Sequence, residues 1–399
     1  MREAIVIGGG PAGLSAALGF LSRDVTPTVL EQRPRWQARV CGAFLSPEAV
    51  RHLEELDLLS ALRARGAVPV TETVVTGSDG RTAAIPIGQQ GTPGLAVARF
   101  DLEQTLTEAV RMRGGRVLAG VRVIAHVRTR TGWVVDARPT ATAARIVGGL
   151  KASDFSTLID GREGRRLRFE APFLALADGR FSSAADRARQ PRRRGWYGWN
   201  ATFVNTRQAP GTLSLHFYDG GYVGALTFAN GETNICGLSV RSTKGERSWE
   251  HIFEEAVERQ PALRALLSES RRMSPWNGVG PLPFCRTMRT GRGEILAGDA
   301  AAVGDPFMGE GNGRALAAGP LIADAMDAGR NDPERVQRAY REKWKRAYRP
   351  RFWIGAAARI VLAYPPLLNM GMSTLLKRPA ALRRATPFFH VGASRRRIL

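Results

Sequence analysis

Short apolar runs separated by glycine and polar turns organise the first part of the chain. Ile5–Ile7 is long enough for one buried strand, and a glycine cluster follows at once. Apolar residues then recur at helical spacing from Leu14 to Leu21, and Thr28–Leu30 forms a second strand that ends at Glu31. This order of strand, glycine turn, helix and strand predicts a βαβ unit over residues 4–31.

Two later apolar strands each end in an acid beside a glycine. One comes before Asp178-Gly179 and the other before Gly298-Asp299. A carboxylate just after a strand can bind the hydroxyls of a polyol. Residues 305–313 then form a glycine-rich loop that opens a helix of small residues over 314–326. Such a loop aims backbone N–H groups and a positive dipole end at a negative site.

The middle of the chain alternates apolar and polar residues with the period of a β-strand. Three such runs cover residues 212–218, 222–228 and 232–240, and Asp-Gly or Asn-Gly dipeptides lie between them. These dipeptides favour two-residue hairpins. In the first run the odd-numbered apolar residues share one face, whereas His216 and its polar neighbours share the other. We therefore expect an antiparallel sheet with one packed face and one face that forms the wall of a pocket.

The glycine cluster near the N-terminus has the spacing of a dinucleotide-binding turn. Gly8, Gly10 and Gly13 fill the G-x-G-x-x-G positions between the first strand and the first helix. The first permits a tight turn, the second lets backbone approach a pyrophosphate, and the third lets helix pack on strand. Glu31 lies 18 residues after Gly13, where an acid reaches ribose hydroxyls. These residues favour FAD or NAD over a ligand with a 2′-phosphate.

Together these three glycine–acid motifs resemble those of the FAD-dependent group A flavoprotein monooxygenases, the p-hydroxybenzoate hydroxylase-like class. The resemblance spans residues 1–330 and implies a resident FAD. Since there is one dinucleotide fingerprint, it also implies NAD(P)H as a transient reductant. The residues implied to contact FAD are Gly8, Gly10, Pro11, Ala12, Gly13, Glu31, Gln32, Arg33, Arg39, Arg99, Val123, Asp178, Gly298, Asp299, Pro306, Gly309, Gly311, Asn312 and Gly313.

The resemblance also assigns roles to individual residues. Arg33 matches a position near the adenosine and phosphates, and Asp299 matches the acid that holds ribityl and pyrophosphate. Asp178 matches the acid linked to FAD and to the passage of NAD(P)H. Arg99 looks like the arginine that reaches the flavin side, and the Gly309–Gly313 segment is implied to lie along the ring.

The expected fold class is mixed α/β (α+β), with a Rossmann-like FAD-binding domain, an antiparallel β-sheet substrate domain and a helical C-terminal region. The FAD-binding domain is expected to comprise residues 1–75, 95–190 and 280–330. The substrate domain is expected to comprise 76–94 and 191–279, and the basic C-terminal region 331–399. Within this scheme residues 188–195 are a crossover and residues 138–168 a polar excursion.

The stretch Arg39–Pro47 resembles the Cys-Gly-Gly-x-Leu-Ser-Pro segment of the geranylgeranyl reductase-like branch of the same superfamily. Ala43 stands where that branch often has glycine. Its last residues also predict a helix, with Ser46 as N-cap and Pro47 in the first turn. Cys41 is a candidate beside the flavin or, equally, a small buried hydrophobic residue. Flavin halogenases are disfavoured, because the Trp-x-Trp-x-Ile-Pro motif is absent.

Two functions follow from the resemblance. The first is an NAD(P)H- and O₂-dependent monooxygenase that hydroxylates a lipophilic aromatic or polyketide-type substrate through a flavin C4a-hydroperoxide. The alternative is a reductase of carbon–carbon double bonds in an isoprenoid. Besides Cys41, His216 and Tyr222 are candidates for deprotonating a phenol, against the simpler interpretation that both are ordinary sheet side chains. The histidines lack metal-ligand spacing, so no metal site is expected.

Charge is concentrated at the C-terminal end. The 399 residues hold 58 Lys+Arg against 36 Asp+Glu, a net charge of +22. Residues 333–399 hold 16 of these cations and two acids, with aromatic residues interleaved. One interpretation is a peripheral contact with an anionic membrane. The other is helices that pack on the FAD-binding domain with a solvated basic face. No recognition motif accompanies the charge, so nucleic acid is not expected.

Cellular location is constrained by the cysteines and by one apolar segment. Cys41, Cys236 and Cys285 are few and far apart, which disfavours a disulfide framework or a zinc site and favours a reducing, cytoplasmic setting. Residues 352–370 are apolar but contain Arg359 and two prolines, which argues against a spanning helix. The expected location is cytoplasmic, with a peripheral site at the inner face of the membrane as the alternative.

Overall fold

The computed structural model describes most of the chain. The described residues are 2–36, 39–88, 91–140, 157–161, 164–180, 194–242, 248–284, 288 and 293–363. Residues 188–193 of the expected crossover and much of the polar excursion at 138–168 lie outside them, as does Cys285.

A parallel five-stranded sheet forms the centre of the larger half of the molecule, in the order β20-β13-β1-β2-β8. Its strands pair in parallel throughout. They are β1 (Arg2–Ile7), β2 (Val25–Glu31), β8 (Arg116–Ala119), β13 (Phe173–Leu176) and β20 (Ile295–Leu296). β1 and β13 are almost wholly buried, as expected for parallel strands covered on both faces. The predicted βαβ unit at the N-terminus is confirmed.

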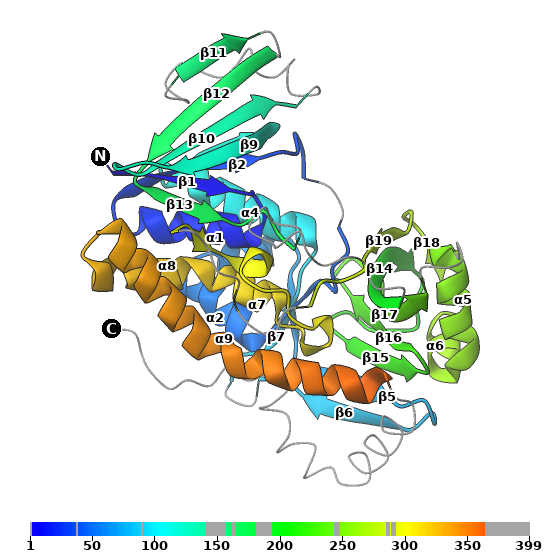
Figure 1. Cartoon of the computed structure of the whole chain (residues 1–399). Helices are drawn as coiled ribbons and strands as arrows, with labels where there is room; N and C mark the ends of the chain where they lie inside the picture. The colour runs from blue at the N-terminus through cyan, green and yellow to red at the C-terminus, as the bar shows by residue number, and fades with distance from the viewer. Residues whose placement is uncertain are drawn as a thin grey trace.

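Helices cover one face of this sheet and a four-stranded antiparallel sheet covers the other (Figure 1). The helices are α1 (Pro11–Leu21), α4 (Arg99–Met112) and α8 (Ala318–Gly329). The antiparallel sheet contains β9 (Val121–Arg128), β10 (Trp133–Pro139), β11 (Thr157–Gly161) and β12 (Gly164–Ala171). These layers share one hydrophobic core, which includes Phe20, Leu106, Val135 and Leu176.

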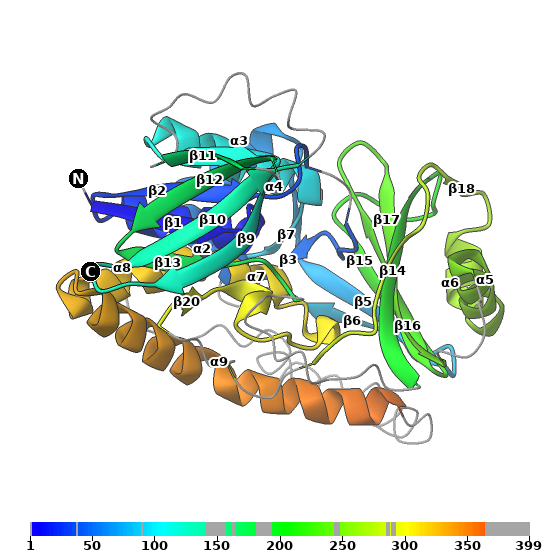
Figure 2. The same ribbon diagram turned by 45° about the horizontal axis from the view of Figure 1, so that its top comes forward.

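The second half of the molecule is an eight-stranded sheet with helices on its outer face (Figure 2). Its strands are β5 (Glu72–Thr76), β6 (Thr82–Pro86), β14 (Arg194–Val204), β15 (Leu213–Tyr218), β16 (Gly221–Thr227), β17 (Thr233–Ser242), β18 (Arg271–Arg272) and β19 (Asn277–Val279). The helices are α5 (Trp249–Arg259) and α6 (Pro261–Leu266). Both hairpin glycines, Gly220 and Gly231, have positive φ angles of 99° and 82°. The predicted hairpins therefore form where the sequence placed them.

A small bridge of structure connects the two halves. It contains β3 (Phe44–Leu45), β7 (Gly94–Ala96) and β4 (Val68–Val70), in that order, with α2 (Pro47–Glu55) and α3 (Leu59–Ala64). Ser46 caps α2 as predicted, since its Oγ accepts the Ala49 N–H at 3.4 Å.

The glycine-rich region after β20 differs from the single helix expected over 314–326. It forms two 3₁₀ turns, η3 (Gly298–Ala300) and η4 (Pro306–Met308), and then two helices, α7 (Gly311–Leu316) and α8. α7 therefore starts inside the loop, and the chain turns between α7 and α8 at Ala317. Since α8 packs on α1, this break lets α7 approach the glycine turn while α8 stays in the helical layer.

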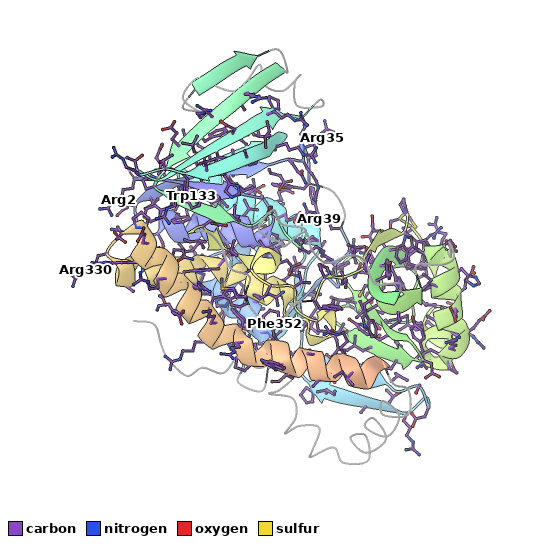
Figure 3. All side chains as sticks on the ribbon, in the orientation of Figure 1. Arg2, Arg35, Arg39, Trp133, Arg330 and Phe352 are labelled. Carbon is purple, nitrogen blue, oxygen red and sulfur yellow. The ribbon has the colours of Figure 1, made fainter. Side chains whose placement is uncertain are left out.

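Helix α9 (Pro333–Ala363) runs from α8 across the molecule and ends toward the eight-stranded sheet (Figures 1 and 2). Tyr340, Trp344, Tyr348 and Phe352 recur every four residues and are each at most 6% exposed. They pack into the hydrophobic core of the larger half of the molecule, and Phe352 lies along the middle of the helix (Figure 3). These four aromatic residues therefore contact the rest of the protein, which agrees with the interpretation that the helices of this region pack on the FAD-binding domain. No helix within the described ranges has the length and apolarity needed to cross a bilayer.

The buried face of α9 gives the first prediction. Trp344→Ala should lower the free energy of unfolding by about 3–5 kcal/mol, because it removes a large side chain whose ring contacts Tyr348 and Phe352. Trp353→Ala, on the exposed side of the same helix, should change it by less than about 0.5 kcal/mol. Urea unfolding measures both. Equal losses would contradict the packing described for α9.

Candidate FAD and substrate site

The turn between β1 and α1 contains glycine for two different reasons. Gly8 has a φ of 105°, and a Cβ on it would lie 2.3 Å from the Ala177 carbonyl oxygen. A Cβ on Gly13 would lie 1.9 Å from the Gly8 carbonyl oxygen, so α1 can approach β1 only with glycine there. Gly10 is extended, and its Cβ would meet nothing nearer than Arg99 Nη2 at 3.7 Å. The open position is the one at which a pyrophosphate approaches.

Glu31, at the end of β2, is buried and ties two backbone segments together. Its Oε2 accepts the Gly9 N–H at 2.7 Å and its Oε1 accepts the Arg33 N–H at 3.0 Å. A carboxylate oxygen has further acceptor capacity, so Glu31 can still accept a ribose hydroxyl. The acid therefore shapes the nucleotide end of the site as well as offering a contact.

Three buried polar atoms of the predicted site and its surroundings have no hydrogen-bond partner in the part of the chain that the structure describes. They are Arg33 Nη1, Arg39 Nε and Glu103 Oε2. Buried polar groups are nearly always paired in folded proteins. An unpaired arginine donor at Arg33, next to the open glycine turn, fits the phosphates of FAD. The residues present therefore suit the cofactor that the sequence predicts.

Arg99 connects the nucleotide end with the flavin side. Its Nε donates to Glu103 Oε1 at 2.7 Å, and its Nη1 donates to Asn312 Oδ1 at 3.0 Å. Burial lowers the pKa of Arg99, but Glu103 and the adjacent Cys41 raise it above its ordinary value. Burial raises the pKa of Glu103, whereas Arg99 and Arg33 lower it. A permanently charged arginine thus stands between the predicted adenosine and flavin positions.

Asp299 follows β20 and lies at the same end of the sheet as the glycine turn. Its Oδ1 accepts from Arg314 Nη2 at 3.0 Å, and Arg180 lies 3.9 Å from Oδ2. Gly298 has a φ of 59°, and a Cβ there would lie 2.6 Å from Ala12 Cβ. The backbone of the Gly298-Asp299 motif therefore contacts the first turn of α1, as the predicted grouping requires.

The remaining predicted contacts differ in their exposure. Asp178 lies two residues after the end of β13 and is exposed, and its backbone nitrogen is 3.0 Å from the position of a Cβ on Gly8. Pro11, Ala12 and Gly313 are buried, Pro306 and Gln32 are exposed, and Val123 is half-buried against the core. A Cβ on Gly311 would have nothing within 4 Å, so α7 also begins beside open space.

The loop between η3 and α7 contains two buried acids that are paired with α9. Asp305 Oδ1 accepts the Phe307 N–H at 3.1 Å, and its Oδ2 accepts from Arg359 Nη1 at 3.3 Å. Glu310 lies 3.5 Å from Arg351, which also pairs with Glu48 at 2.5 Å. Burial raises the pKa of Asp305 to about 6 and that of Glu310 to about 7, while the arginines lower both. The C-terminal helix thereby neutralises both ends of the loop.

Phe307, at the middle of this loop, connects it with the eight-stranded sheet. Its ring lies 5.6 Å from Phe217 and 5.8 Å from Tyr222, both edge-on. Val75 and Leu238 complete the cluster on this face of the sheet. The sheet has two distinct faces as expected, and its apolar face, rather than the mixed face of His216, meets the loop that contains Gly309, Gly311 and Gly313.

Cys41 lies between the flavin side and the sheet. Its Sγ accepts the Ala43 N–H at 3.3 Å and lies 3.7 Å from Asn312 Nδ2. Its carbonyl accepts from Asn234 Nδ2 at 3.0 Å, which attaches the segment to β17. Cys236, on the same strand, is a second thiol nearby, and burial raises its pKa to about 12.

The structure corrects the roles suggested for His216 and Tyr222. His216 points to the outer face of the sheet, where its Nε2 lies 3.1 Å from Ser214 Oγ, and burial lowers its pKa to about 4. Alternation puts it on the side of Tyr218, whose ring packs with residues of α5, and so away from the flavin. Tyr222 does face the site, but burial raises its pKa well above 10. It is a neutral donor at pH 7 and cannot deprotonate a phenol.

The site contains several residues that lie outside the three motifs, and the sequence carries a signal for one of them. Glu103 lies four residues after Arg99 on α4, so the helical pairing was readable from spacing. Phe307 lies inside the glycine-rich loop, but an apolar residue there has no distinctive pattern. Arg351 and Arg359 are far along the chain from their acids, and only the packing of α9 brings them together.

Comparison with known proteins agrees with this geometry. Residues 1–317 match the family described as FAD binding domain. The protein is therefore an FAD-dependent oxidoreductase. The chain belongs to the FAD binding domain family of group A flavoprotein monooxygenases, which confirms the resemblance drawn from its three motifs.

Two curated relatives cover most of the chain. It is 26% identical over 347 residues to a menaquinone reductase of Mycolicibacterium smegmatis, covering 82% of this chain and 76% of the relative. It is 25% identical over 353 residues to 3-amino-4-hydroxybenzoate 2-monooxygenase of Streptomyces cremeus, covering 84% and 81%. The relatives thus include both a reductase and a monooxygenase.

Two solved structures share the fold. One is a geranylgeranyl bacteriochlorophyll reductase-like protein from Thermoplasma acidophilum, with a TM-score of 0.74, 17% identity and 97% and 96% of the two chains covered. The other is HpxO of Klebsiella pneumoniae in complex with FAD and uric acid, with a TM-score of 0.72, 16% identity and 98% and 97% covered. At this identity they establish the fold, and the predicted fold class is confirmed.

The glycine turn gives a prediction about cofactor affinity. Gly10→Ala should fold normally, because its Cβ meets only ordinary contacts, but it should weaken FAD binding at least about tenfold by occupying the phosphate approach. Gly13→Ala should instead lower thermal stability even without FAD. Titration of the apoprotein with FAD, followed by flavin fluorescence, measures the first effect. Native affinity in Gly10→Ala would place the pyrophosphate elsewhere.

The Asp305–Arg359 pair gives a prediction about pH. Because the folded pKa of Asp305 is raised from its ordinary value to about 6, its ionisation opposes folding as pH rises from about 4 to 6. Arg359→Gln removes the compensating charge and should destabilise the protein by about 2 kcal/mol at pH 7. The loss should shrink toward pH 4, because Asp305 is then protonated in the folded protein and no carboxylate is left for Arg359 to compensate.

A double-mutant cycle provides the control for this pair. In an Asp305→Asn background, Arg359→Gln should cost little at either pH, because no buried carboxylate remains to be neutralised. Urea unfolding at the two pH values measures all four proteins. An equal cost of Arg359→Gln with and without Asp305 would show that the arginine acts through other contacts.

Proposed function

We propose that the protein is an FAD-dependent monooxygenase that uses NAD(P)H and O₂ to hydroxylate a lipophilic aromatic substrate. The observation that carries this is the aromatic wall of Phe217, Tyr222 and Phe307, which joins the substrate sheet to the flavin-side loop. Flat apolar rings bind well against such walls through offset or edge contacts. The curated relative named as an aminohydroxybenzoate monooxygenase supports the same reaction type.

The residues of the chain then have distinct tasks. The bound FAD supplies the redox chemistry, taking electrons from NAD(P)H and passing them to O₂. Gly10 and Arg33 hold its pyrophosphate end, and Arg99 places a fixed positive charge beside the flavin. Phe307 excludes water from the substrate face, and the neutral Tyr222 hydroxyl donates a hydrogen bond that orients an oxygen of the substrate.

A second candidate is reduction of a carbon–carbon double bond in an isoprenoid-bearing substrate, and Cys41 favours it. Its thiol is beside Asn312 and Arg99, where a proton donor is needed to complete the saturation of a double bond. A thiol is also readily oxidised, which makes it a poor neighbour for an oxygen-transfer reaction. The relatives named menaquinone reductase support this alternative.

Isotope labelling separates the two candidates. The FAD-loaded protein, supplied with NADPH or NADH, is incubated under ¹⁸O₂ with a phenol that bears a long alkyl chain, and without O₂ with menaquinone. Monooxygenation adds one ¹⁸O atom to the phenol, whereas the reductase adds two hydrogens to the isoprenoid chain of menaquinone in the absence of O₂, and these hydrogens remain after any quinol has been reoxidised in air. Mass spectrometry distinguishes the products. Hydrogen addition without ¹⁸O incorporation would overturn the first proposal.

Cys41→Ser supplies an independent discriminating prediction. If Cys41 donates the proton, double-bond reduction should fall at least about tenfold while FAD binding is unchanged, because a hydroxyl is a far weaker acid than a thiol. Hydroxylation should change by less than about threefold, since Cys41 then only fills space. Product formation with each probe measures the effect.

A further inference from the structure

Helix α9 has an outer face that is as regular as its buried one. Arg335, Arg338, Arg346, Arg349, Trp353 and Ile360 recur at intervals of three, four, seven or eight residues and are all exposed. At 3.6 residues per turn they lie on one side of the helix, which we call the outer stripe. Glu342 is the acid on the same side, and it is paired with Lys345.

Three cations of α9 are paired with acids outside the helix. Arg351, Arg359 and Lys343 contact Glu310, Asp305 and Asp324, so their charge is compensated inside the protein.

The four arginines of the outer stripe make no ion pair with any residue in the described ranges. Their charge is therefore directed outward and is available to a negative partner.

The C-terminal end of the stripe is apolar. Trp353 is 52% exposed and Ile360 is 55% exposed, two turns apart on the same side of the helix. An interfacial helix typically combines such residues with arginine, since the bilayer boundary accepts aromatic and aliphatic side chains while head groups bind the cations. Binding to nucleic acid would account for the arginines, but it would not account for the exposed aliphatic side chain of Ile360.

We infer that the outer stripe of α9 lies on an anionic membrane surface. This inference rests on the proposed function, because a lipophilic substrate partitions into lipid and the enzyme would have to meet it there. The inner side of the same turns contacts Asp305 and Glu310 through Arg359 and Arg351. The flavin-side loop is thus about one helix diameter, roughly 10 Å, from the surface that meets the lipid. Docking at the stripe brings the substrate site to its source.

Vesicle co-sedimentation tests the inference with the FAD-loaded full chain. The native protein should bind vesicles of phosphatidylcholine with phosphatidylglycerol, bind phosphatidylcholine alone much less, and release in high salt. Arg346→Gln with Arg349→Gln should weaken binding to the anionic vesicles by about fivefold for each arginine removed. Trp353→Ser with Ile360→Ser should weaken binding and make what remains more sensitive to salt.

A charge-matched control is available on other surfaces. Arg130→Gln with Arg271→Gln removes two exposed cations outside α9 and should leave vesicle binding unchanged. Absence of native binding, or equal binding by native and both stripe variants, would overturn the inference. Binding to single-stranded RNA that is lost in the arginine variant but kept in the Trp353 and Ile360 variant would assign the stripe to nucleic acid. Vesicle binding needs no turnover, so failure of the proposed reaction is observed separately.

Discussion

The site depends on the contact between the backbones of Gly8 and Gly13. Any Cβ on Gly13 would overlap the Gly8 carbonyl, so only glycine lets the start of α1 lie against the end of β1. This contact fixes the first turn of α1, and Gly298 in turn packs on Ala12 in that turn. Strand ends that are far apart in the chain are thereby brought around one open position. The location of the cofactor site follows from a steric limit between two backbone segments.

The sequence predicted those parts whose chemistry is local. The βαβ unit, the Ser46 cap and the Gly220 and Gly231 hairpins each depend on residues within one turn or one strand, and each is confirmed. The strand that contains His216 was also predicted, but the side of the sheet to which His216 points was not. Alternation shows which side chains share a face, but it does not show which face meets the flavin, because that depends on the packing of α5 against the sheet.

Long-range charge pairing lay beyond the sequence for a related reason. In the sequence, Arg359 only interrupts an apolar segment and Asp305 only belongs to a glycine-rich loop, so nothing indicates that the two side chains meet. Their interaction exists because four buried aromatic residues fix the rotation of α9, and that rotation decides which arginines turn inward. The same rotation leaves the remaining arginines outside. One set of packing contacts therefore determines both the neutralisation of the flavin-side loop and the charge of the outer surface.

The two acids of that loop depend on a part of the chain outside the matched family region. The matched family region ends at residue 317, whereas the arginines that neutralise Asp305 and Glu310 lie beyond residue 350. Each arginine lowers the pKa of its acid, so its replacement would raise that pKa further. A helix outside the matched region therefore sets the acidity of a loop inside it.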